Sequence, residues 1–501
     1  MNCPTLLRVV YSVIRQCIPI LLCGIAAQSC STLQQHASAH TESSGTVSSD
    51  NAAKARRIMR EAGLHFSSDT TKAYSYDPPG SLVTTNKQIE LPKRRVILFS
   101  KAGVGFSTDF DGARLNDVVM LNDSTFRATV APENAPINFS AWYAFKVWST
   151  IPSKIIRLTL TYTEAHHRYI PKLSRTPSAD WRSWRPIDST SYIPHYDSTG
   201  RTITSATLRL ALTPDTLWVS AQELFTSRDF EVWSTRLAAL PFVQKTVLGK
   251  SALGKPIIRL DISEARPDAP CVVVISRQHP PEHTGTLALL PFVEEFTSQT
   301  PLAQEFRKKF RVFVVPCVNP DGVDAGHWRH NAHGVDLNRD WYNFNQPETR
   351  LVRDALLHMR DSLKTRFVFG VDFHTTQHDI FYTLSNPPLV TAQDSIAYAT
   401  IPEYSTYNTE AAQRSAFVEQ WLERLQELFP TYQVTISDSP RTPHGATSGR
   451  WFDRELRAPA VTYEAGDETP RELIQSIGAA SARILMQMLL DREKTINRSQ
   501  E

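Results

Sequence analysis

Cysteine is scarce in this sequence. Six of the 501 residues are cysteine, and four of these lie in the first thirty residues. The other two, Cys271 and Cys317, stand in apolar, strand-like runs, and we expect them to be small buried hydrophobic residues rather than partners in a disulfide framework. No CxxC pair occurs, which excludes a cysteine-based zinc site.

A large net charge is also missing. The formal charge is +3, and two of the positive residues, Arg8 and Arg15, lie in the first thirty residues, which contain no acidic residue. The rest of the chain therefore carries only +1, which argues against nucleic-acid binding through a broad basic surface. The sequence has no internal repeat and no coiled-coil pattern, so repeat architectures are excluded as well.

The N-terminal apolar run, CIPILLCGIAA, is too short to predict a membrane-spanning helix. Together with Arg8 and Arg15 it is typical of a secretory signal over residues 1–30. Cys30 follows small residues, as the lipid-modified cysteine of a bacterial lipoprotein does; simple secretion is the alternative. We therefore expect an exported protein, periplasmic or anchored to the outer membrane of a bacterium, with a lipid on Cys30 as its only membrane attachment.

The length of the chain predicts more than one domain. Residues 31–90 are rich in Ser, Thr, Gln and His at first and predict a flexible tether followed by irregular structure. Residues 91–225 contain short β-rich segments such as RRVILFS and ATLRLAL, separated by Pro, Gly, Asp and Asn. This pattern predicts an antiparallel β-sandwich domain.

Over residues 226–495 strand-like and helical segments alternate. This pattern predicts an α/β domain with a mostly parallel mixed sheet flanked by helices. Four apolar runs in it end in chemically active residues: CVVVIS, VFVVPCV, FVFGVDF and PAVTY. Because ligands bind at the carboxyl ends of parallel strands, we expect these residues to converge in one crevice.

A metal site is predicted at these strand ends. His279 and Glu282, in HPPE, follow CVVVIS, and His374 follows FVFGVDF. Catalytic zinc typically takes three His or carboxylate ligands from the protein and leaves a fourth position for water. We therefore predict one Zn²⁺ ion held by His279, Glu282 and His374.

Other residues compete for these roles. The segment HWRHNAH has three histidines but no carboxylate partner, and we interpret them as solvated loop residues: His327, His330 and His333. His283 and His378 are interpreted as supporting or solvent-exposed residues.

The catalytic acid and the substrate-binding groups are predicted from two further segments. Glu464, in TYEAGDE, is the candidate general acid/base, and Glu468 beside it is interpreted as an exposed charge. Arg329, Asn338 and Arg339 supply cationic and amide donors, which suit an oxyanion and a substrate carboxylate.

Taken together, these motifs resemble the zinc carboxypeptidase family of the pancreatic carboxypeptidase fold. The matching segments are HPPE, NPDG, GVDLNR, DFH and TYEAG, in the family's order. More narrowly, the chain is similar to the cytosolic-carboxypeptidase branch, which places a β-sandwich before the catalytic domain. VILFSKAGVGFSTDFDGARLNDV, INFSAWYAFKVWS and TSGRWFDREL carry this narrower likeness, which covers roughly residues 90–490.

The resemblance implies a role for each site residue. His279, Glu282 and His374 would bind zinc, and Glu464 would be the general acid/base. Arg329 would polarise the scissile carbonyl and stabilise the oxyanion. The remaining roles are carboxylate binding by Asn338 and Arg339, orientation of His279 by Asp336, and contact of Arg450 with an acidic C-terminal side chain.

One departure from the family concerns its substrate-covering tyrosine. An ungapped comparison puts Thr442 at that position, and Tyr432 would serve only if the loop is rearranged. The exported leader is a second departure, because it disagrees with the cytosolic name of the branch.

These observations predict a zinc metallocarboxypeptidase that hydrolyses a C-terminal peptide bond and prefers acidic C-terminal residues. Its expected partners are peptides or cell-wall peptide stems, and no nucleic acid. Two alternatives are a peptidoglycan γ-glutamyl amidase or endopeptidase on the same scaffold, and an inactive binding module. The oligomeric state is not predicted.

Overall fold

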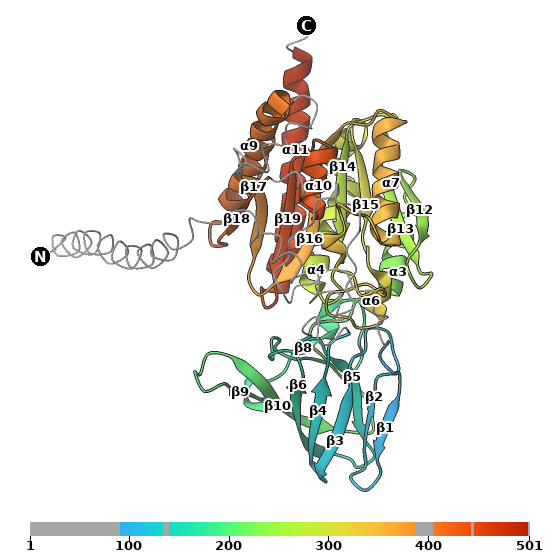
Figure 1. The fold of residues 1–501 in the computed structure, drawn as a ribbon, viewed down its shortest axis with the longest axis vertical. Coiled ribbons are helices and arrows are strands. Elements are labelled where there is room, and N and C mark those ends of the chain that lie inside the picture. The colour runs from blue at the N-terminus through green and yellow to red at the C-terminus, as the bar shows by residue number, and fades with distance from the viewer. Residues whose placement is uncertain (1–90, 134–139, 386–403, 442–444, 499–501) are drawn as a thin grey trace, which may run out of the picture. The chain divides into compact units, whose positions relative to one another are not determined.

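The computed structural model describes residues 91–133, 140–385, 404–441 and 445–498 (Figure 1). The predicted signal peptide, the lipidated Cys30 and the tether therefore lie outside the described residues. Within them, β1 to β11 precede residue 225, and the first helix of the following α/β part begins at Ser227. The domain boundary near residue 225 stays a prediction.

Two sheets make up the N-terminal part. The first has the order β1-β2-β5-β11-β7-β8 and is antiparallel throughout. Its strands are β1 (Val96–Phe99), β2 (Val104–Ser107), β5 (Ala144–Ser149), β11 (Leu217–Ser220), β7 (Lys172–Ser174) and β8 (Arg185–Pro186). The second sheet has the order β3-β4-β6-β10-β9. Its strands are β3 (Asp117–Asn122), β4 (Thr125–Val130), β6 (Lys154–Tyr162), β10 (Ile203–Leu212) and β9 (Tyr192–Tyr196).

The two sheets enclose one apolar core, as a β-sandwich requires. Phe106 from the first sheet and Phe126 from the second lie 5.6 Å apart between ring centroids. Alternate residues of β4 and β6 face this core, which explains the mixed apolar and polar pattern of their sequences. One pair departs from the expected antiparallel pattern, because β4 runs parallel to β6.

The C-terminal part is built on an eight-stranded sheet of order β12-β13-β15-β14-β16-β19-β17-β18. Its strands are β12 (Val243–Lys250), β13 (Pro256–Ile262), β15 (Arg311–Val315), β14 (Cys271–Ser276), β16 (Phe367–Thr376), β19 (Ala460–Gly466), β17 (Ile380–Ser385) and β18 (Ile436–Pro440). The central strands β15, β14, β16 and β19 are mutually parallel, and antiparallel pairs flank them. The predicted mostly parallel mixed sheet is therefore confirmed.

Helices cover both faces of this sheet (Figure 1). One face carries α3 (Ser227–Leu237), α4 (His283–Thr297), α5 (Pro301–Arg307), α9 (Tyr404–Leu428) and α11 (Arg471–Arg498). The other carries α7 (Pro347–Asp361) and α10 (Ser448–Glu455). The short helix α6 (Pro320–Asp324) follows β15, and single 3-10 turns occur at η1 (Trp181–Ser183), η2 (Ser189–Ser191) and η3 (Leu337–Arg339).

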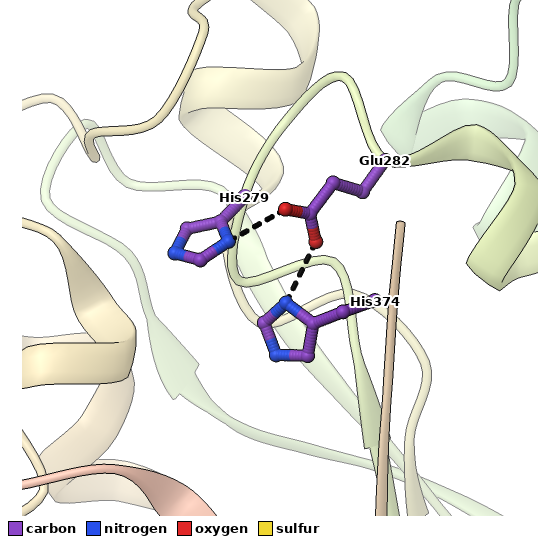
Figure 2. A group of neighbouring side chains, drawn as sticks. All are labelled: His279, Glu282 and His374. Atoms are coloured by element: carbon purple, nitrogen blue, oxygen red, sulfur yellow. Dashed lines mark hydrogen bonds and ion pairs between the residues drawn. The ribbon is translucent and has the colours of Figure 1, made fainter. Parts of the chain in front are cut away.

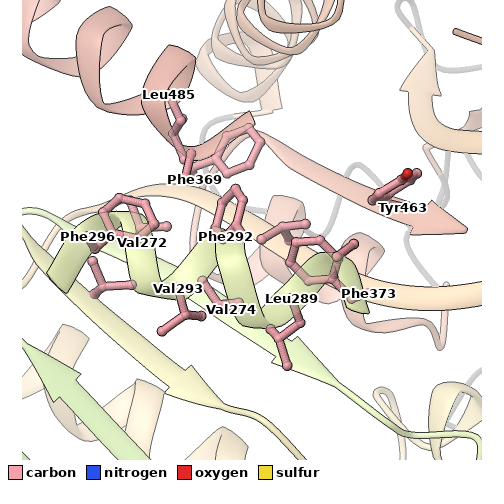
Figure 3. Close-up of a cluster of buried hydrophobic side chains, with 14 of the residues drawn as sticks. Val272, Val274, Leu289, Phe292, Val293, Phe296, Phe369, Phe373, Tyr463 and Leu485 are labelled. Atoms are coloured by element: carbon pink, nitrogen blue, oxygen red, sulfur yellow. The ribbon is translucent and has the colours of Figure 1, made fainter. Parts of the chain in front are cut away.

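Strand β14 shows why its sequence is a continuous apolar run. Every residue in it is buried, with Val272 and Val274 in the α4 core and Val273 in the core under α7. Figure 3 shows the first of these cores, in which Val272 and Val274 lie close to Phe292 and Phe296 of α4. A strand buried on both faces has no polar side, so the usual alternation disappears.

Helix α11 contributes to the same core. Within the described residues, its segment Arg471–Thr495 is the one helix long and apolar enough to cross a membrane by length and composition. However, 61% of its most apolar window is buried, and Ile477, Leu485 and Leu489 belong to the core that α4 also fills. Cys271 and Cys317, the two cysteines among the described residues, are free and buried as predicted.

Candidate active site

Three neighbouring strands bring the predicted metal ligands together. His279 lies in the turn after β14, and Glu282 is the N-cap residue of α4, the next element. His374 lies within β16, which extends to Thr376, and pairs directly with Glu464 of β19. Because β14, β16 and β19 are adjacent and parallel, all four residues meet at one edge of the sheet.

The two imidazoles face one carboxylate (Figure 2). Nδ1 of His279 lies 2.7 Å from Oε1 of Glu282, and Nδ1 of His374 lies 2.7 Å from Oε2. One ligand atom from each residue lies within 4.8 Å of the others, so a single ion can be shared by all three.

Two aspartates hold the far side of the imidazoles. Nε2 of His279 lies 2.9 Å from Asp336, and Nε2 of His374 lies 2.8 Å from Asp372. An aspartate at Nε2 assigns the ring proton to that nitrogen, so the lone pair of Nδ1 points at Glu282. Two nitrogen lone pairs and a carboxylate that face one another attract a cation, and this donor set suits zinc.

The pKa values of the cluster also reflect how its imidazoles and carboxylates face one another. Burial favours the neutral forms, but the adjacent carboxylates outweigh it and raise the pKa of His279 and of His374. Burial opposes ionisation of Glu282 too, yet the two imidazoles lower its pKa below the usual range. Arg329 and His279 likewise lower the pKa of the buried Asp336, although burial acts against ionisation. The cluster is thus built to hold negative charge around a positive centre.

A cavity of about 370 Å³ opens over this cluster. Seven of the nine predicted site residues line it: His279, Glu282, Arg329, Asn338, Arg339, Arg450 and Glu464. The other two, His374 and Asp336, are fully buried behind it. The convergence expected from the strand ends is therefore present in the folded chain.

Glu464 faces the cavity with a buried carboxylate oxygen, Oε2, that has no hydrogen-bond partner within the described part of the chain. Burial and the neighbouring charge of Glu282 raise its pKa to about 7, although His374 and His279 act in the opposite direction. Glu468 is exposed, as interpreted from the sequence, and pairs with Lys172 at 2.7 Å.

The predicted substrate-binding residues come from the segment before α7 and from α10. Nε of Arg329 pairs with Asp336 at 2.6 Å, which links it to the imidazole of His279. Asn338 in η3 accepts a hydrogen bond from the backbone N–H of Ser448 at 3.0 Å, which ties η3 to α10. Nη1 of Arg339 donates to the carbonyl of Asn338 at 3.1 Å.

Some interpretations from the sequence change. His327 and His330 are fully buried rather than solvated, because they pack around the buried carboxylate of Glu133, and only His333 is exposed. His283 is also buried, 4.0 Å from Glu223. Tyr432 belongs to the apolar core, and Thr442 lies outside the described residues.

Several residues at or behind the cavity were not predicted from the sequence. Asp372 could have been found, because residues i and i+2 of a strand share a face and it stands two places before His374. Tyr382 of β17 and the pair Arg168 and Tyr169 of the β-sandwich also line the cavity. No local pattern marks these three residues.

Comparison with known proteins identifies the C-terminal part. A family model described as zinc carboxypeptidase matches residues 232–481. This region is a zinc carboxypeptidase domain. The family binds one zinc ion, and the cluster of His279, Glu282 and His374 fits that ion.

Relatives of the zinc carboxypeptidase domain include the cytosolic carboxypeptidase 6 of Mus musculus and that of Caenorhabditis elegans. The first is 21% identical over 58% of this chain and 56% of its own length; the second is 22% identical over 54% and 61%. The chain thus spans less than two thirds of the length of these curated relatives. A metallocarboxypeptidase structure from Burkholderia cenocepacia, 18% identical, superposes with a TM-score of 0.59 over 77% of this chain and 98% of that chain.

These relatives correct the predicted location. We expected an exported protein, periplasmic or anchored to the outer membrane, from the apolar leader. That expectation is wrong, because the related carboxypeptidases of mouse, C. elegans and human are named as cytosolic proteins and point to the cytosol. A short apolar run with two arginines is a weak signal, and nothing in the domain supports it.

Proposed function

We propose that the protein is a zinc-dependent metallocarboxypeptidase that hydrolyses the C-terminal peptide bond of peptides, with a preference for an acidic last residue. The observation that supports it is a single cavity shared by the metal-ligand cluster, the carboxylate of Glu464 and the cationic groups of Arg339 and Arg450. The peptidoglycan and inactive-module alternatives have no such support.

The metal has a defined place in this proposal. His279, Glu282 and His374 would hold zinc, with Asp336 and Asp372 orienting the two imidazoles. When bound, zinc supplies a Lewis acid that polarises a carbonyl and lowers the pKa of water.

Proton transfer is assigned to Glu464. Its carboxylate lines the cavity and its Oε2 atom has no hydrogen-bond partner among the residues that the structure describes, so it is available to a water molecule. In the proposed reaction Glu464 takes a proton from the attacking water and returns it to the leaving amine. Arg329 is assigned to the oxyanion that forms on the scissile carbonyl, because a cationic donor stabilises developing negative charge.

Substrate selection is assigned to Asn338, Arg339 and Arg450. An amide and a guanidinium suit the terminal carboxylate, which an exopeptidase must recognise. Arg450 stands at the same cavity, beside Thr447 and Gly449, and a guanidinium there favours an acidic side chain on the last residue.

Three peptides test the proposal: one ending in Glu, the same peptide ending in Gln, and the Glu peptide with its terminus amidated. We expect the zinc-loaded protein to cleave the Glu peptide best and the amide at a rate lower by a factor of about 100 or more, because the amide cannot pair with Arg339. Equal cleavage of the free acid and the amide would refute the carboxypeptidase assignment.

Variants of two glutamates complete the test. Glu464→Gln is expected to lower kcat by roughly 10²–10⁴ while zinc content stays stoichiometric. Glu472→Gln, an exposed residue in the first turn of α11, is the matched control and is expected to keep full activity. Full activity in Glu464→Gln would remove this residue from the mechanism.

A further inference from the structure

The β-sandwich contributes directly to the active-site cavity. Arg168 and Tyr169 lie between β6 and β7, and both line the same cavity as the metal ligands. Trp328, from the segment that also carries Arg329, packs against both of them and lines the same cavity. One part of the cavity wall therefore consists of residues that precede the first metal ligand, His279, by more than 100 positions in the sequence.

This wall is anchored independently of Arg168. The backbone N–H of Ile170 donates to Oε1 of Glu468, and Nζ of Lys172 pairs with Oε2 of the same residue at 2.7 Å. Gln222, just after β11, also donates to the backbone carbonyl of Asp467. The β-sandwich thus contacts the segment after β19 through several hydrogen bonds. These contacts do not depend on the guanidinium of Arg168.

The guanidinium of Arg168 is held in one orientation. Its Nε atom donates to Oδ2 of Asp467 at 2.6 Å. Its carbon lies 5.1 Å from the ring centroid of Tyr169 and 5.2 Å from that of Trp328. An arginine held by one ion pair and two aromatic rings has lost most of its rotamer freedom before any ligand arrives.

Its terminal nitrogens remain available. Arginine has five N–H donors, and Asp467 takes only the one on Nε. No protein group among the described residues accepts a hydrogen bond from the other four, and 19% of the side chain stays exposed. Two parallel N–H groups on a fixed guanidinium match a carboxylate, which binds them in a bidentate manner.

The position of Arg168 indicates which carboxylate it meets. The residues assigned to the terminal carboxylate belong to η3, which is tied to α10 through Asn338 and Ser448. Arg168 instead belongs to the wall that is attached beyond the end of β19, through Asp467. When the last residue of a bound peptide lies against η3 and α10, its scissile bond lies at the metal ligands. The residues before that bond then extend toward the wall that carries Arg168.

We propose that Arg168 is a substrate-binding residue of the β-sandwich, which pairs with an acidic side chain immediately upstream of the scissile bond. The inference rests on the proposed carboxypeptidase function and deepens it, because it adds a specificity-determining residue from outside the zinc carboxypeptidase domain. The β-sandwich thereby acts as part of the specificity pocket.

The test compares two peptides that share the same last residue and differ only in a penultimate Glu or Gln. With wild-type protein we expect kcat/KM to favour the Glu peptide by about 10- to 100-fold, as for a charge-assisted hydrogen bond. In Arg168→Gln this ratio should fall to about 1, mainly through loss of the Glu peptide. Arg168→Lys, which keeps the charge without the fork, should restore part of the preference.

Arg182 provides a matched control. It lies in the same β-sandwich, stacks on Trp181 at 4.7 Å and pairs with the exposed Asp180, but it does not line the cavity. Arg182→Gln should leave the Glu/Gln ratio unchanged. Thermal melts of all variants show whether each is folded.

Two outcomes would overturn the proposal. A Glu/Gln ratio that Arg168→Gln leaves unchanged excludes contact with the upstream side chain. An equal loss for both peptides would mean that Arg168 acts only as the partner of Asp467.

Measurements of peptide binding distinguish a failure of the Arg168 proposal from a failure of the proposed catalytic function. Calorimetry with the Glu464→Gln variant measures the affinity of both peptides without turnover. If neither peptide is cleaved by wild-type protein but the Glu peptide binds more tightly in an Arg168-dependent manner, the proposed reaction fails and the subsite stands. If both are cleaved with no Arg168-dependent difference in rate or affinity, the reaction stands and the subsite fails.

Discussion

At the scale of single residues, the metal site depends on the carboxylates behind the imidazoles as well as on the ligands. Asp372 is fully buried and accepts hydrogen bonds from His374 at 2.8 Å, from Gln278 at 2.6 Å and from Ser448. It therefore fixes the ring of His374 in the orientation that points Nδ1 at Glu282. Such partners of zinc-binding histidines typically govern metal affinity.

We predict that Asp372→Asn lowers zinc affinity by about 10- to 100-fold, because an amide oxygen is a weaker acceptor for the imidazole N–H than a carboxylate. Competition with a chromophoric chelator measures the change.

The control for this variant is Asp261→Asn. Asp261 is also a buried strand aspartate, but it pairs with Arg259 and Arg311 on β13 and β15, away from the metal ligands. It should lose stability without losing zinc affinity. Equal zinc affinity in wild type and Asp372→Asn would contradict the role given to Asp372.

At the scale of elements, the site depends on how closely α4 approaches the sheet. A Cβ atom on Gly285, in the first turn of α4, would lie 2.5 Å from the backbone oxygen of His374. The N–H of Gly285 also donates to Thr375 at 2.8 Å, so helix and strand are joined at the metal ligand. The other side of α4 has a similar close approach, where a Cβ on Gly478 of α11 would lie 2.2 Å from the oxygen of Ala288.

Substitutions of Gly285 and Gly478 can be compared directly, because each would disturb a close backbone contact of α4. Gly285→Ala and Gly478→Ala should each lower the free energy of unfolding by about 1–3 kcal/mol, because the added methyl group overpacks a rigid backbone contact. Only Gly285→Ala should also weaken zinc binding, since it displaces the backbone of His374. Urea unfolding and chelator competition measure the two effects; unchanged zinc affinity in Gly285→Ala would show that β16 is not displaced.

At the scale of the whole molecule, the β-sandwich supports the loop that carries Arg329. Glu133 follows β4, and its carboxylate accepts hydrogen bonds from the backbone N–H groups of Trp328, Arg329 and His330 at 2.9, 2.9 and 3.1 Å. Burial opposes ionisation of Glu133, but His327, His330, Arg114 and the N–H of Trp328 together lower its pKa to about 2. This carboxylate is therefore ionised at every pH at which the protein would be assayed.

We predict that Glu133→Gln lowers the free energy of unfolding at pH 7 by about 3 kcal/mol, because an amide leaves one or more buried N–H groups without an acceptor. The pKa of Glu133 lies below its ordinary value of 4.5 in the folded state, so its contribution is present above pH 4.5 and lost as the pH falls toward 2. The difference between wild type and variant should therefore shrink between pH 7 and pH 3.5.

Urea unfolding at these two pH values tests the prediction. Glu164→Gln, an exposed glutamate of the same β-sandwich, should show no difference from wild type at either pH. A stability gap between wild type and Glu133→Gln that widens as the pH falls would contradict the assigned charge state.

The sequence by itself determined the class of the fold and predicted which residues gather at one edge of the sheet. Strands buried on both faces lose their polar alternation, so CVVVIS and FVFGVDF could be identified, and the carboxyl ends of parallel strands meet at one edge. These two rules are local, and they sufficed to predict that His279, Glu282, His374 and Glu464 converge. The leader misled for the same reason, because a short local pattern says nothing about the domain that follows.

Only the tertiary structure decided the remaining walls of the site. Arg168 lines the cavity from the β-sandwich, and Glu133 of the same β-sandwich binds the loop of Arg329, around which His327 and His330 become buried. Which residues of one domain face another depends on how two finished surfaces pack, and no periodicity along the chain encodes that packing. The positions of the strand ends follow from hydrogen bonds between neighbouring strands of one sheet. The cavity wall instead depends on contacts between residues that are far apart in the sequence, such as Arg168 and Asp467.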